Sequence, residues 1–308
     1  MVNPIRLDDR VAIVTGAGGG IGKCHALLLA KLGARVVVND LGTPGTDGRG
    51  SGSAMADAVV EEIRSKGGEA VPNYDTVSTA EGGAAIVQSA LDRWGRIDVV
   101  VNNAGILRDR SFAKLDWSDL DAVVDVHLKG AFYVSQPAFK AMKQAGYGRF
   151  VFTSSASGLF GNFGQTNYGA AKSGLVGLSN VLGLEGRKHN ILSNVIAPIA
   201  RTRMTEDLLG PAASLFRPEQ TSPIVAYLSS SECHLNKEVF SVGGGRIARV
   251  FTGLTRGWVG SSNMSVDDVR DNLSSIMDPT GFIEPDSIAD ETRLMAELLR
   301  KGIVHDAD

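Results

Sequence analysis

The sequence predicts an α/β fold, with a doubly wound parallel sheet of about seven strands, helices on both of its faces and a helical C-terminal extension. Three observations lead to this prediction. Short β-branched apolar runs alternate with amphipathic segments, glycines end several of those segments, and polar residues follow the apolar runs. Because the carboxyl ends of parallel strands share one edge of a sheet, the polar residues are expected to form one ligand site.

Each strand is expected at an apolar run, and each helix at a segment with a period of about 3.6 residues. The strands are expected at 11–15, 35–39, 69–74, 97–101, 149–153, 191–196 and 239–242. The first helix is expected to end near residue 32, and the others to span 55–66, 79–94, 117–145, 166–188 and 223–230. Residues 41–53, rich in Gly, Thr and Ser, predict an extended loop.

A glycine turn directly follows the first expected strand. It reads Gly16-Ala17-Gly18-Gly19-Gly20-Ile21-Gly22, and a helix, a second strand and Asp40 come after it. Glycines permit a tight turn and close approach of a diphosphate, and the helix N-terminus offers free N–H groups. We therefore expect a Rossmann-like dinucleotide site that includes Gly16, Gly18, Gly20, Ile21 and Gly22. A glycine loop without a ligand is the alternative, which the order of elements disfavours.

Asp40 bears on which dinucleotide would bind. A carboxylate at this position can accept hydrogen bonds from both ribose hydroxyls and would repel a 2′-phosphate. No basic residue interrupts the glycine turn, although Lys23 follows it and could reach a phosphate. NAD is therefore favoured over NADP, and the loop at 41–53 could cover the adenosine.

Further candidate site residues lie at the ends of the other expected strands. Asp75 could contact adenine or be an ordinary loop acid. The expected cofactor-binding residues at these strand ends are Asp75, Thr76, Asn103, Ala104, Gly105 and Ile199. Nothing in the chain has the spacing of metal ligands, so no metal is expected.

Tyr168 and Lys172 are four residues apart on the helix expected at 166–188, so their side chains should stack on one face. A lysine ammonium nearby favours the phenolate, which would lower the tyrosine pKa from about 10 and make it a usable base. Ser155 follows the fifth expected strand and could hold the reacting oxygen. An incidental Tyr–Lys pair on a surface helix is the alternative, which the rest of the chain disfavours.

Residues 1–245 are expected to form one dinucleotide-binding and catalytic domain. Residues 246–308 are expected to be an extension that packs on this core or at a subunit interface, with helices at 266–276 and 287–300. This extension is too short for an independent domain of ordinary size.

Composition favours a packed globular core, because 43% of the residues are hydrophobic and 21% are charged. A net charge of -3 gives no general attraction to nucleic acid or to an anionic membrane. The two cysteines, Cys24 and Cys233, indicate no disulfide framework and fit a reduced, cytoplasmic setting. No membrane span, signal peptide or C-terminal peroxisomal address is expected.

Four motifs, in order along residues 8–245, resemble the short-chain dehydrogenase/reductase family. They are Thr15-Gly16-x-x-x-Gly20-x-Gly22, Asn102-Asn103-Ala104-Gly105, Ser155 and Tyr168-x-x-x-Lys172. The segments VVVNDLG, NYDTV, NNAGILRDRSF, SSASGLFGNFGQTNY and LEGRKHNI are similar to one branch, the (3R)-hydroxyacyl-CoA dehydrogenase units of type 2 peroxisomal multifunctional enzymes, also called 17β-hydroxysteroid dehydrogenases type 4. FSVGGGRIARV and the residues after it resemble the extension of that unit. The resemblance implies a stand-alone, bacterial-type version.

The resemblance implies a role for each matching residue. Tyr168 would exchange a proton with the substrate oxygen, Ser155 would hydrogen-bond the same oxygen, and Lys172 would lower the tyrosine pKa and bind the nicotinamide ribose. Asn103 would support the central strand and the cofactor. The long helix before the fifth strand and the helix carrying Tyr168 would pair between subunits in a homodimer or homotetramer.

Two positions depart from the family pattern. Where the family often has an asparagine in a proton relay, VDVHLKG places His127, which could relay protons or could be a structural histidine bonded to backbone. The hydroxyacyl-CoA branch shares this histidine. Ala197-Pro198-Ile199 stands where the family usually has Pro-Gly in a loop that contacts nicotinamide.

The expected function is NAD-dependent interconversion of a (3R)-3-hydroxyacyl-CoA and a 3-oxoacyl-CoA, in β-oxidation of fatty acids or sterol side chains. The alternatives are a dehydrogenase of 17β-hydroxysteroids or other bulky secondary alcohols, a 3-oxoacyl-carrier-protein reductase, which Asp40 disfavours, and a catalytically silent dinucleotide sensor. Arg108 and Arg110 could meet CoA phosphates, but a solvated or salt-bridged role is favoured.

Overall fold

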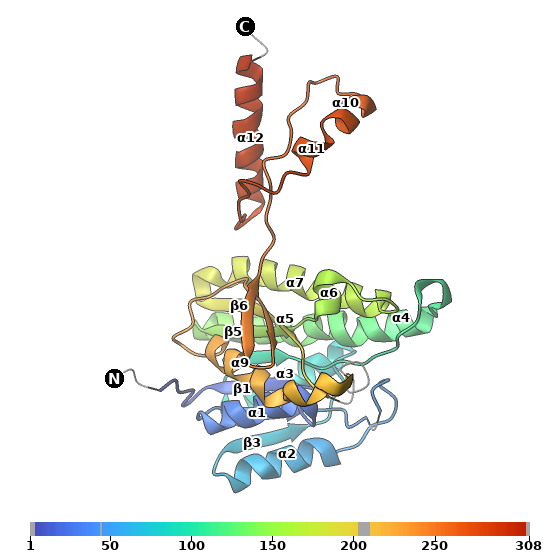
Figure 1. Cartoon of the computed structure of the whole chain (residues 1–308). Coiled ribbons are helices and arrows are strands. Elements are labelled where there is room, and N and C mark those ends of the chain that lie inside the picture. Colours follow the sequence, from blue (N-terminus) through green and yellow to red (C-terminus); the bar gives the residue numbers. More distant parts are fainter. Residues whose placement is uncertain (1–3, 44, 203–209, 306–308) are drawn as a thin grey trace. The chain divides into compact units, whose positions relative to one another are not determined.

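An eight-stranded sheet forms the centre of the larger unit in the computed structural model, which describes residues 4–43, 45–202 and 210–305. The chain divides into two compact units, Met1–Arg249 and Val250–Asp308. The strand order is β3-β2-β1-β4-β5-β6-β7-β8, and the pairings from β3 to β7 are parallel (Figure 1). The predicted doubly wound parallel sheet is therefore confirmed.

The strands lie where the apolar runs predict them, with one addition. They are β1 (Val11–Thr15), β2 (Arg35–Asn39), β3 (Glu69–Asn73), β4 (Val99–Asn102), β5 (Gly148–Thr153), β6 (Ile191–Pro198), β7 (Val239–Gly243) and β8 (Arg246–Val250). Every residue of β1, β4 and β5 is buried, which explains why apolar residues run through them without alternation.

The described part of the chain has one strand more than the roughly seven that were predicted, and the additional strand is β8. Gly244 and Gly245 both have positive φ, +58° and +82°, as a two-residue hairpin turn requires. The turn brings β8 back beside β7, and so short a connection can join only antiparallel neighbours. Exposed arginines occupy part of this edge strand, so it lacks the apolar run that marks the inner strands.

The helices cover both faces of the sheet. They are α1 (Gly20–Lys31), α2 (Ala54–Ser65), α3 (Ala80–Trp94), α4 (Trp117–Val124), α5 (Gly130–Ala145), α6 (Ala156–Phe160), α7 (Thr166–Gly186) and α9 (Ser222–Leu228). Alternate strand residues such as Ala12 and Val14 pack in one core cluster with residues of α1, α2 and α9. Helix α3 packs on α5, and α4 packs on α7 (Figure 1).

The helix predicted at 117–145 is present without a break, but it is not α-helical throughout. A π-helical turn, η2 (Asp125–Lys129), separates α4 from α5, and such turns recur at functional sites. The short helix α6, which follows β5 directly, was not predicted. At only five residues it is too short to show a helical period.

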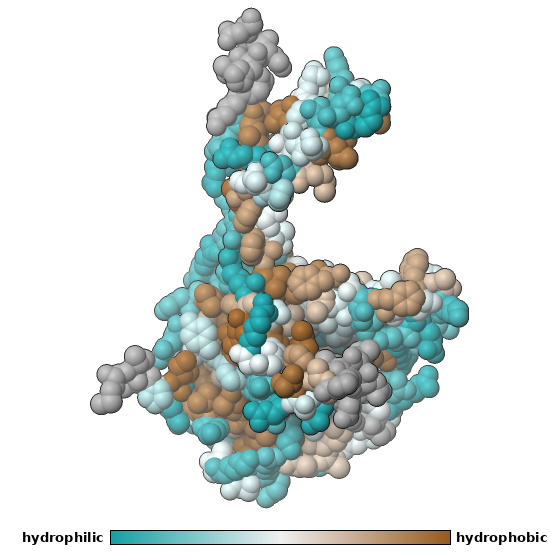
Figure 2. Space-filling view, in the orientation of Figure 1, coloured by the Kyte–Doolittle hydropathy of each residue, from teal (hydrophilic) through white to brown (hydrophobic). Residues whose placement is uncertain are grey.

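The unit Val250–Asp308 holds α10 (Val266–Asp271), α11 (Leu273–Ile276) and α12 (Ile288–His305). Leu254 and Ile283 exchange backbone hydrogen bonds of 2.9 Å. Within this unit many apolar side chains are exposed, among them Val266 and Met277 (Figure 2). The division expected after residue 245 falls inside the β7–β8 hairpin.

Parallel strands β1 to β7 end at one edge of the sheet, here called the carboxyl edge. The residues that follow those strands define it: Gly16 after β1, Asp40 after β2, Asp75 after β3, Asn103 after β4, Ser155 after β5 and Ile199 after β6. Between β1 and β4 the strand order reverses, and such a switch point forms a ligand crevice.

Candidate active site

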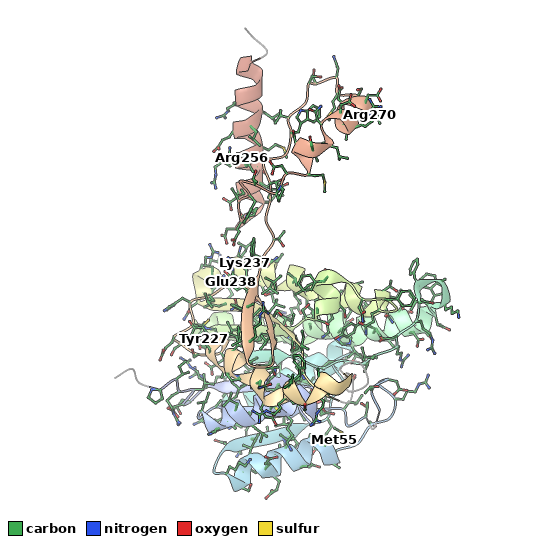
Figure 3. The ribbon with its side chains drawn as sticks, in the orientation of Figure 1. Met55, Tyr227, Lys237, Glu238, Arg256 and Arg270 are labelled. Atoms are coloured by element: carbon green, nitrogen blue, oxygen red, sulfur yellow. The ribbon has the colours of Figure 1, made fainter. Side chains whose placement is uncertain are left out.

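The turn between β1 and α1 is packed so closely that only glycine fits at several positions. Gly16 and Gly20 have positive φ, +63° and +53°. A Cβ on Gly18 would lie 2.8 Å from the carboxyl carbon of Asp40, and one on Gly22 would lie 2.2 Å from the carbonyl oxygen of Gly16. Met55, at the start of α2, packs against the same turn (Figure 3). Side chains at these positions would collide with their neighbours, so the turn presents its own backbone at this part of the carboxyl edge.

Asp40 faces this turn from the end of β2. Its carboxylate accepts hydrogen bonds from the N–H groups of Gly18 at 2.8 Å and Gly42 at 2.7 Å. The N-cap of α1, Gly19, supplies no side-chain cap, so the first N–H groups of α1 remain available to an anion. A glycine cradle, a helix N-terminus and a carboxylate beside it fit a dinucleotide with free ribose hydroxyls.

Lys23, which could have reached a phosphate, has another partner. Its ammonium forms an ion pair of 2.7 Å with Glu62 of α2. The same carboxylate also pairs with Lys66 at 2.6 Å, so Lys23 is held on the α2 side by a shared partner.

Asn103 and Ala104 join the end of β4 to the glycine turn. The Asn103 amide donates to the carbonyl oxygens of Thr15 at 3.0 Å and Gly16 at 3.2 Å. The Thr15 hydroxyl in turn accepts the backbone N–H groups of Asn103 and Ala104, both at 3.0 Å. These bonds hold both sides of the β1–β4 crevice in one geometry.

Asp75 and Thr76 occupy the end of β3. Asp75 is exposed, its side chain accepts from Asn73 at 2.8 Å, and its carbonyl accepts from Asn39 at 2.9 Å. The Thr76 hydroxyl is bonded to Ser78 at 2.8 Å. Asp75 thus lies on the carboxyl edge beside Asp40, on the strand next in order.

The structure brings Ser155, Tyr168 and Lys172 together. Ser155 follows β5 and caps α6 by accepting the N–H of Ser157 at 3.2 Å, and it is close enough to the Tyr168 side chain to lower the pKa of that tyrosine. The Lys172 ammonium lies 5.6 Å from the centre of the Tyr168 ring and donates to the carbonyl oxygen of Thr153. Gly158 permits the contact of α6 with α7, because a Cβ there would lie 2.7 Å from the Lys172 Cβ.

The direction of the Tyr168 pKa corrects the expectation from the helical spacing. Burial raises the pKa of Tyr168 above its ordinary value, and the hydrogen bond from Ser155 lowers it only in part. Burial also lowers the pKa of Lys172 to about 7. A lysine that is only partly charged near neutral pH does little to favour a phenolate, so desolvation wins over the neighbouring cation.

His127 lies in the π-helical turn, against Tyr168. Its ring meets the Tyr168 ring edge-on, with centres 5.1 Å apart. Its Nε2 lies 3.0 Å from the Ile106 nitrogen and 2.8 Å from the Ile106 oxygen, so it either accepts the N–H or donates to the carbonyl, according to the tautomer. Its buried Nδ1 has no partner. Gly105 makes room for the ring, since a Cβ there would lie 2.3 Å from the His127 Cε1. Burial and the charge of Lys172 hold the pKa of His127 well below its ordinary value.

A small cavity beside Lys172 is lined by His127, Lys172, Asn102 and Thr15. The predicted structural role of His127, bonded to backbone, is therefore present. The relay role stays a prediction that rests on the free Nδ1.

Ile199 follows β6, and its N–H donates to Val242 at 2.7 Å. Its side chain is exposed. The expected nicotinamide loop begins here and runs into residues 203–209, which lie outside the described residues.

The sequence reasoning missed Gln165 and Asn167, two buried side chains at the start of α7. The Asn167 side chain accepts the N–H of Tyr168 at 2.8 Å and donates to the carbonyl oxygen of Arg108 at 2.9 Å. Gln165 donates to Asp109 at 2.7 Å. The sequence signal that could have identified these two residues was their position next to Tyr168. Exposed amide side chains in the first turn of a helix would give the same sequence pattern, so the signal does not show that these two are buried.

Arg108 is salt-bridged, as was favoured over a phosphate contact. Its guanidinium lies 3.5 Å from the carboxylate of Asp119, and both side chains are mostly buried. Arg110 is exposed and donates to the carbonyl oxygen of Asp109 at 3.4 Å. The described residues contain no cluster of three or more His, Cys, Asp or Glu that could hold a metal ion, and none of their helices is both long and apolar enough to cross a membrane.

Comparison with known proteins shows which proteins this chain resembles. A family model described as short chain dehydrogenase matches residues 10–210. A short-chain type dehydrogenase/reductase of Mycobacterium tuberculosis is 53% identical over 276 residues, which cover 89% of this chain and 96% of the relative. Peroxisomal multifunctional enzyme type 2 of Mus musculus is 48% identical over 98% of this chain, which spans only 41% of that enzyme.

Solved structures agree with these sequence matches. The full-length peroxisomal multifunctional enzyme type 2 of Drosophila melanogaster superposes with a TM-score of 0.81 at 38% identity, over 96% of this chain and 50% of that one. A short chain dehydrogenase of Mycobacterium avium superposes with a TM-score of 0.76 at 40% identity, over 89% of this chain and 97% of that one.

Proposed function

This chain belongs to the short-chain dehydrogenase family, and from that premise we propose that it interconverts a (3R)-3-hydroxyacyl-CoA and a 3-oxoacyl-CoA with NAD as cofactor. The observation that carries the proposal is the meeting of Ser155, Tyr168 and Lys172 at the same sheet edge as the glycine cradle and Asp40. A proton donor and a dinucleotide site on one edge are what an alcohol dehydrogenase requires.

Gly16, Gly18 and Gly20 would hold the diphosphate, and Asp40 the hydroxyls of the adenosine ribose. Asp75 and Thr76 would lie near adenine, whereas Asn103, Ala104, Gly105, Lys172 and Ile199 would line the nicotinamide side. When bound, the dinucleotide supplies hydride transfer. The position of the Asp40 carboxylate against the glycine turn supports NAD over NADP, because a 2′-phosphate would be repelled there.

The chain's own groups handle the oxygen and its proton. Ser155 and Tyr168 would both hydrogen-bond the substrate oxygen and so position the carbon that bears it. With its raised pKa, Tyr168 is protonated at neutral pH and suited to donate a proton to a ketone. The reverse reaction requires Tyr168 to lose that proton, so oxidation should become faster as pH rises.

The surface near Tyr168 supports a large apolar substrate. Phe112 and Trp117 follow the segment after β4, and Phe160 and Phe163 precede α7. The side chains of all four are more than 70% exposed. A bridge between Arg110 and Gln165 joins the two segments. Exposed aromatic side chains on these two joined segments would offer apolar surface to an acyl chain or to a sterol-derived side chain.

The relatives support an acyl substrate through the name of one of them and through the extent of the matches. The mouse and fly multifunctional enzymes match nearly the whole chain, including the extension. A relative from Synechocystis, 36% identical over 78% of this chain, is named 3-oxoacyl-[acyl-carrier-protein] reductase, which also acts at C3 of an acyl group.

NADH formation, measured with purified protein, NAD and a panel of alcohols, tests the proposal. We expect turnover with (3R)-3-hydroxyacyl-CoAs, at least 100-fold slower turnover with the (3S) isomers, and little with a free 17β-hydroxysteroid. Faster oxidation of the steroid would replace the proposal with the bulky-alcohol alternative. NADH binding without turnover of any alcohol would favour a dinucleotide sensor.

We also propose that the chain self-associates as a homodimer or homotetramer through α5 and α7. Both helices expose apolar side chains, including Phe132, Val181 and Leu184. Sedimentation equilibrium of the full chain tests the assembly, and a monomer at micromolar concentration would contradict it.

A further inference from the structure

The loop after β2 is closed at its neck. The N–H of Gly52 donates to the carbonyl oxygen of Leu41 at 2.9 Å. Gly42 has a φ of +72°, and a Cβ there would lie 1.8 Å from the carbonyl oxygen of Gly52. The neck is therefore pinned directly beside Asp40, at the adenosine side of the proposed cofactor site.

The far end of this loop is attached to a different part of the carboxyl edge. The carbonyl oxygen of Thr46 accepts the N–H of Leu107 at 2.8 Å, and that of Asp47 accepts the Arg108 Nε–H at 3.0 Å. Gly48 packs on Ile106, because a Cβ there would lie 2.9 Å from its side chain. Residues 45–50, here called the strap, thus reach the segment that follows β4.

The two attachment points lie on opposite sides of β1. Strand β1 pairs with β2 on one side and with β4 on the other, and neighbouring strands are about 4.8 Å apart. A strap that starts beside β2 and ends on the segment after β4 must therefore pass the carboxyl end of β1. The glycine turn and the crevice mouth lie at that end.

Arg108 is held from the core side, which makes it a firm anchor. Its guanidinium pairs with Asp119 of α4 at 3.5 Å, and its carbonyl oxygen accepts from Asn167 of α7 at 2.9 Å. Its Nε–H is left to bond the strap. Because the acceptor in the strap is a backbone carbonyl, the bond depends on the residue at 108 and not on the side chain at 47.

We propose that Arg108 is a positioning residue that latches the strap over the adenosine and diphosphate half of the bound dinucleotide. The inference rests on the proposed function for its ligand. A latched strap is ordered before the dinucleotide binds, so its conformational entropy is not lost on binding. Without the latch, the strap would lose conformational entropy when the dinucleotide binds, so the complex would be less stable and the dinucleotide would dissociate faster.

Arg108→Met in the full chain tests the latch. The probes are NADH, followed by fluorescence titration and stopped-flow dissociation, and ADP-ribose, followed by calorimetry. We expect the Kd of NADH and the Kd of ADP-ribose to rise about tenfold, because one charge-assisted hydrogen bond is lost. Almost all of this rise should come from a faster dissociation rate. The value of kcat at saturating NAD should stay within about twofold, because the strap contacts neither Ser155 nor Tyr168.

Two variants separate the latch from general damage. Asp119→Asn removes the anchor of Arg108 but keeps the Nε–H donor, so a smaller rise of about threefold is expected. Arg93→Met, the matched control, removes an exposed arginine of α3 that lies 3.9 Å from Glu69, and it should change neither Kd nor the dissociation rate.

Equal dissociation rates for Arg108→Met and the wild type would overturn the proposal, as would a fall in kcat that matches the rise in Kd. A wild-type protein that binds no dinucleotide would overturn the proposed function together with the strap. If the wild type binds NADH and Arg108→Met binds it equally well, the latch proposal alone is wrong and the proposed function stands.

Discussion

The two edges of the sheet treat buried charge in opposite ways. The amino edge is the opposite edge, where strands β1 to β7 begin, and Asp98 lies there directly before β4. Its carboxylate is fully buried and accepts hydrogen bonds from Arg10 at 3.0 Å, from Arg96 at 2.6 Å and from the N–H of Val11 at 2.9 Å. At the carboxyl edge, the buried Lys172 ammonium has a backbone carbonyl as its partner in place of a carboxylate. Two other buried atoms of this edge, His127 Nδ1 and Thr153 Oγ1, have no partner.

The two edges also differ in how each treats a tyrosine. Tyr147 lies between the guanidinium groups of Arg10 and Arg149, 3.7 Å and 4.3 Å from its ring centre, and its hydroxyl donates to the carbonyl oxygen of Ser229. Tyr168 lies near Ser155 and meets the His127 ring edge-on, with no arginine among its ring contacts in the described part of the chain. Satisfied groups hold a fold together, whereas groups left short of partners are typical of sites that bind or react.

Removing one hydroxyl from each tyrosine should give the largest contrast. Tyr168→Phe removes the proposed proton donor, so kcat should fall by about 10²–10⁴-fold while NADH still binds. Tyr147→Phe loses only a hydrogen bond to Ser229, so kcat should be unchanged. Steady-state kinetics and an NADH titration of both variants check this, and near-normal turnover of Tyr168→Phe would refute the assigned mechanism.

Removing one charge from each edge should separate stability from activity. Asp98→Asn leaves two arginines without their shared carboxylate, and the free energy of unfolding should fall by roughly 3 kcal/mol. Lys172→Met replaces a poorly compensated buried ammonium with an apolar chain, so stability should change by less than about 1 kcal/mol or rise, while turnover is lost.

Urea denaturation of these two charge variants, beside turnover assays, measures both quantities. Equal losses of stability would show that the two edges are built alike.

His25 extends the comparison to a buried group away from Tyr168, between α1 and α9. Its Nδ1 bonds Ser222 at 2.9 Å, its Nε2 has no partner, and burial lowers its pKa to about 3. The unfolded chain, with a pKa of about 6.5, binds the proton more readily, so stability is full above that pH and falls as pH drops. Between pH 7 and pH 5 this group should cost about 2 kcal/mol.

His25→Asn keeps a donor near Ser222 but cannot titrate. Thermal or urea unfolding from pH 7 to pH 5 should therefore show a shallower loss for this variant than for the wild type. The same slope in both proteins would contradict the depressed pKa of His25.

Much of the fold could be predicted because its signals are local. The inner strands are continuous apolar runs that need no knowledge of their neighbours, and Gly16 to Asp40 carries a motif whose spacing is set by a ligand. β8 and α6 escaped prediction because one is an exposed edge strand made by a hairpin and the other is shorter than the period that would reveal it. The π-helical turn at His127 also leaves no mark in a helical pattern.

The candidate site divides along the same line. The sequence alone determined which residues reach the carboxyl edge, because strand ends and a four-residue spacing are properties of the chain itself. Only the tertiary structure decided the electrostatics of these residues. Burial raises the pKa of Tyr168 and lowers the pKa of Lys172. The fold also places Arg108 between the carboxylate of Asp119 and the backbone of the strap. Desolvation and partner choice depend on segments far apart in sequence, and no local pattern records them.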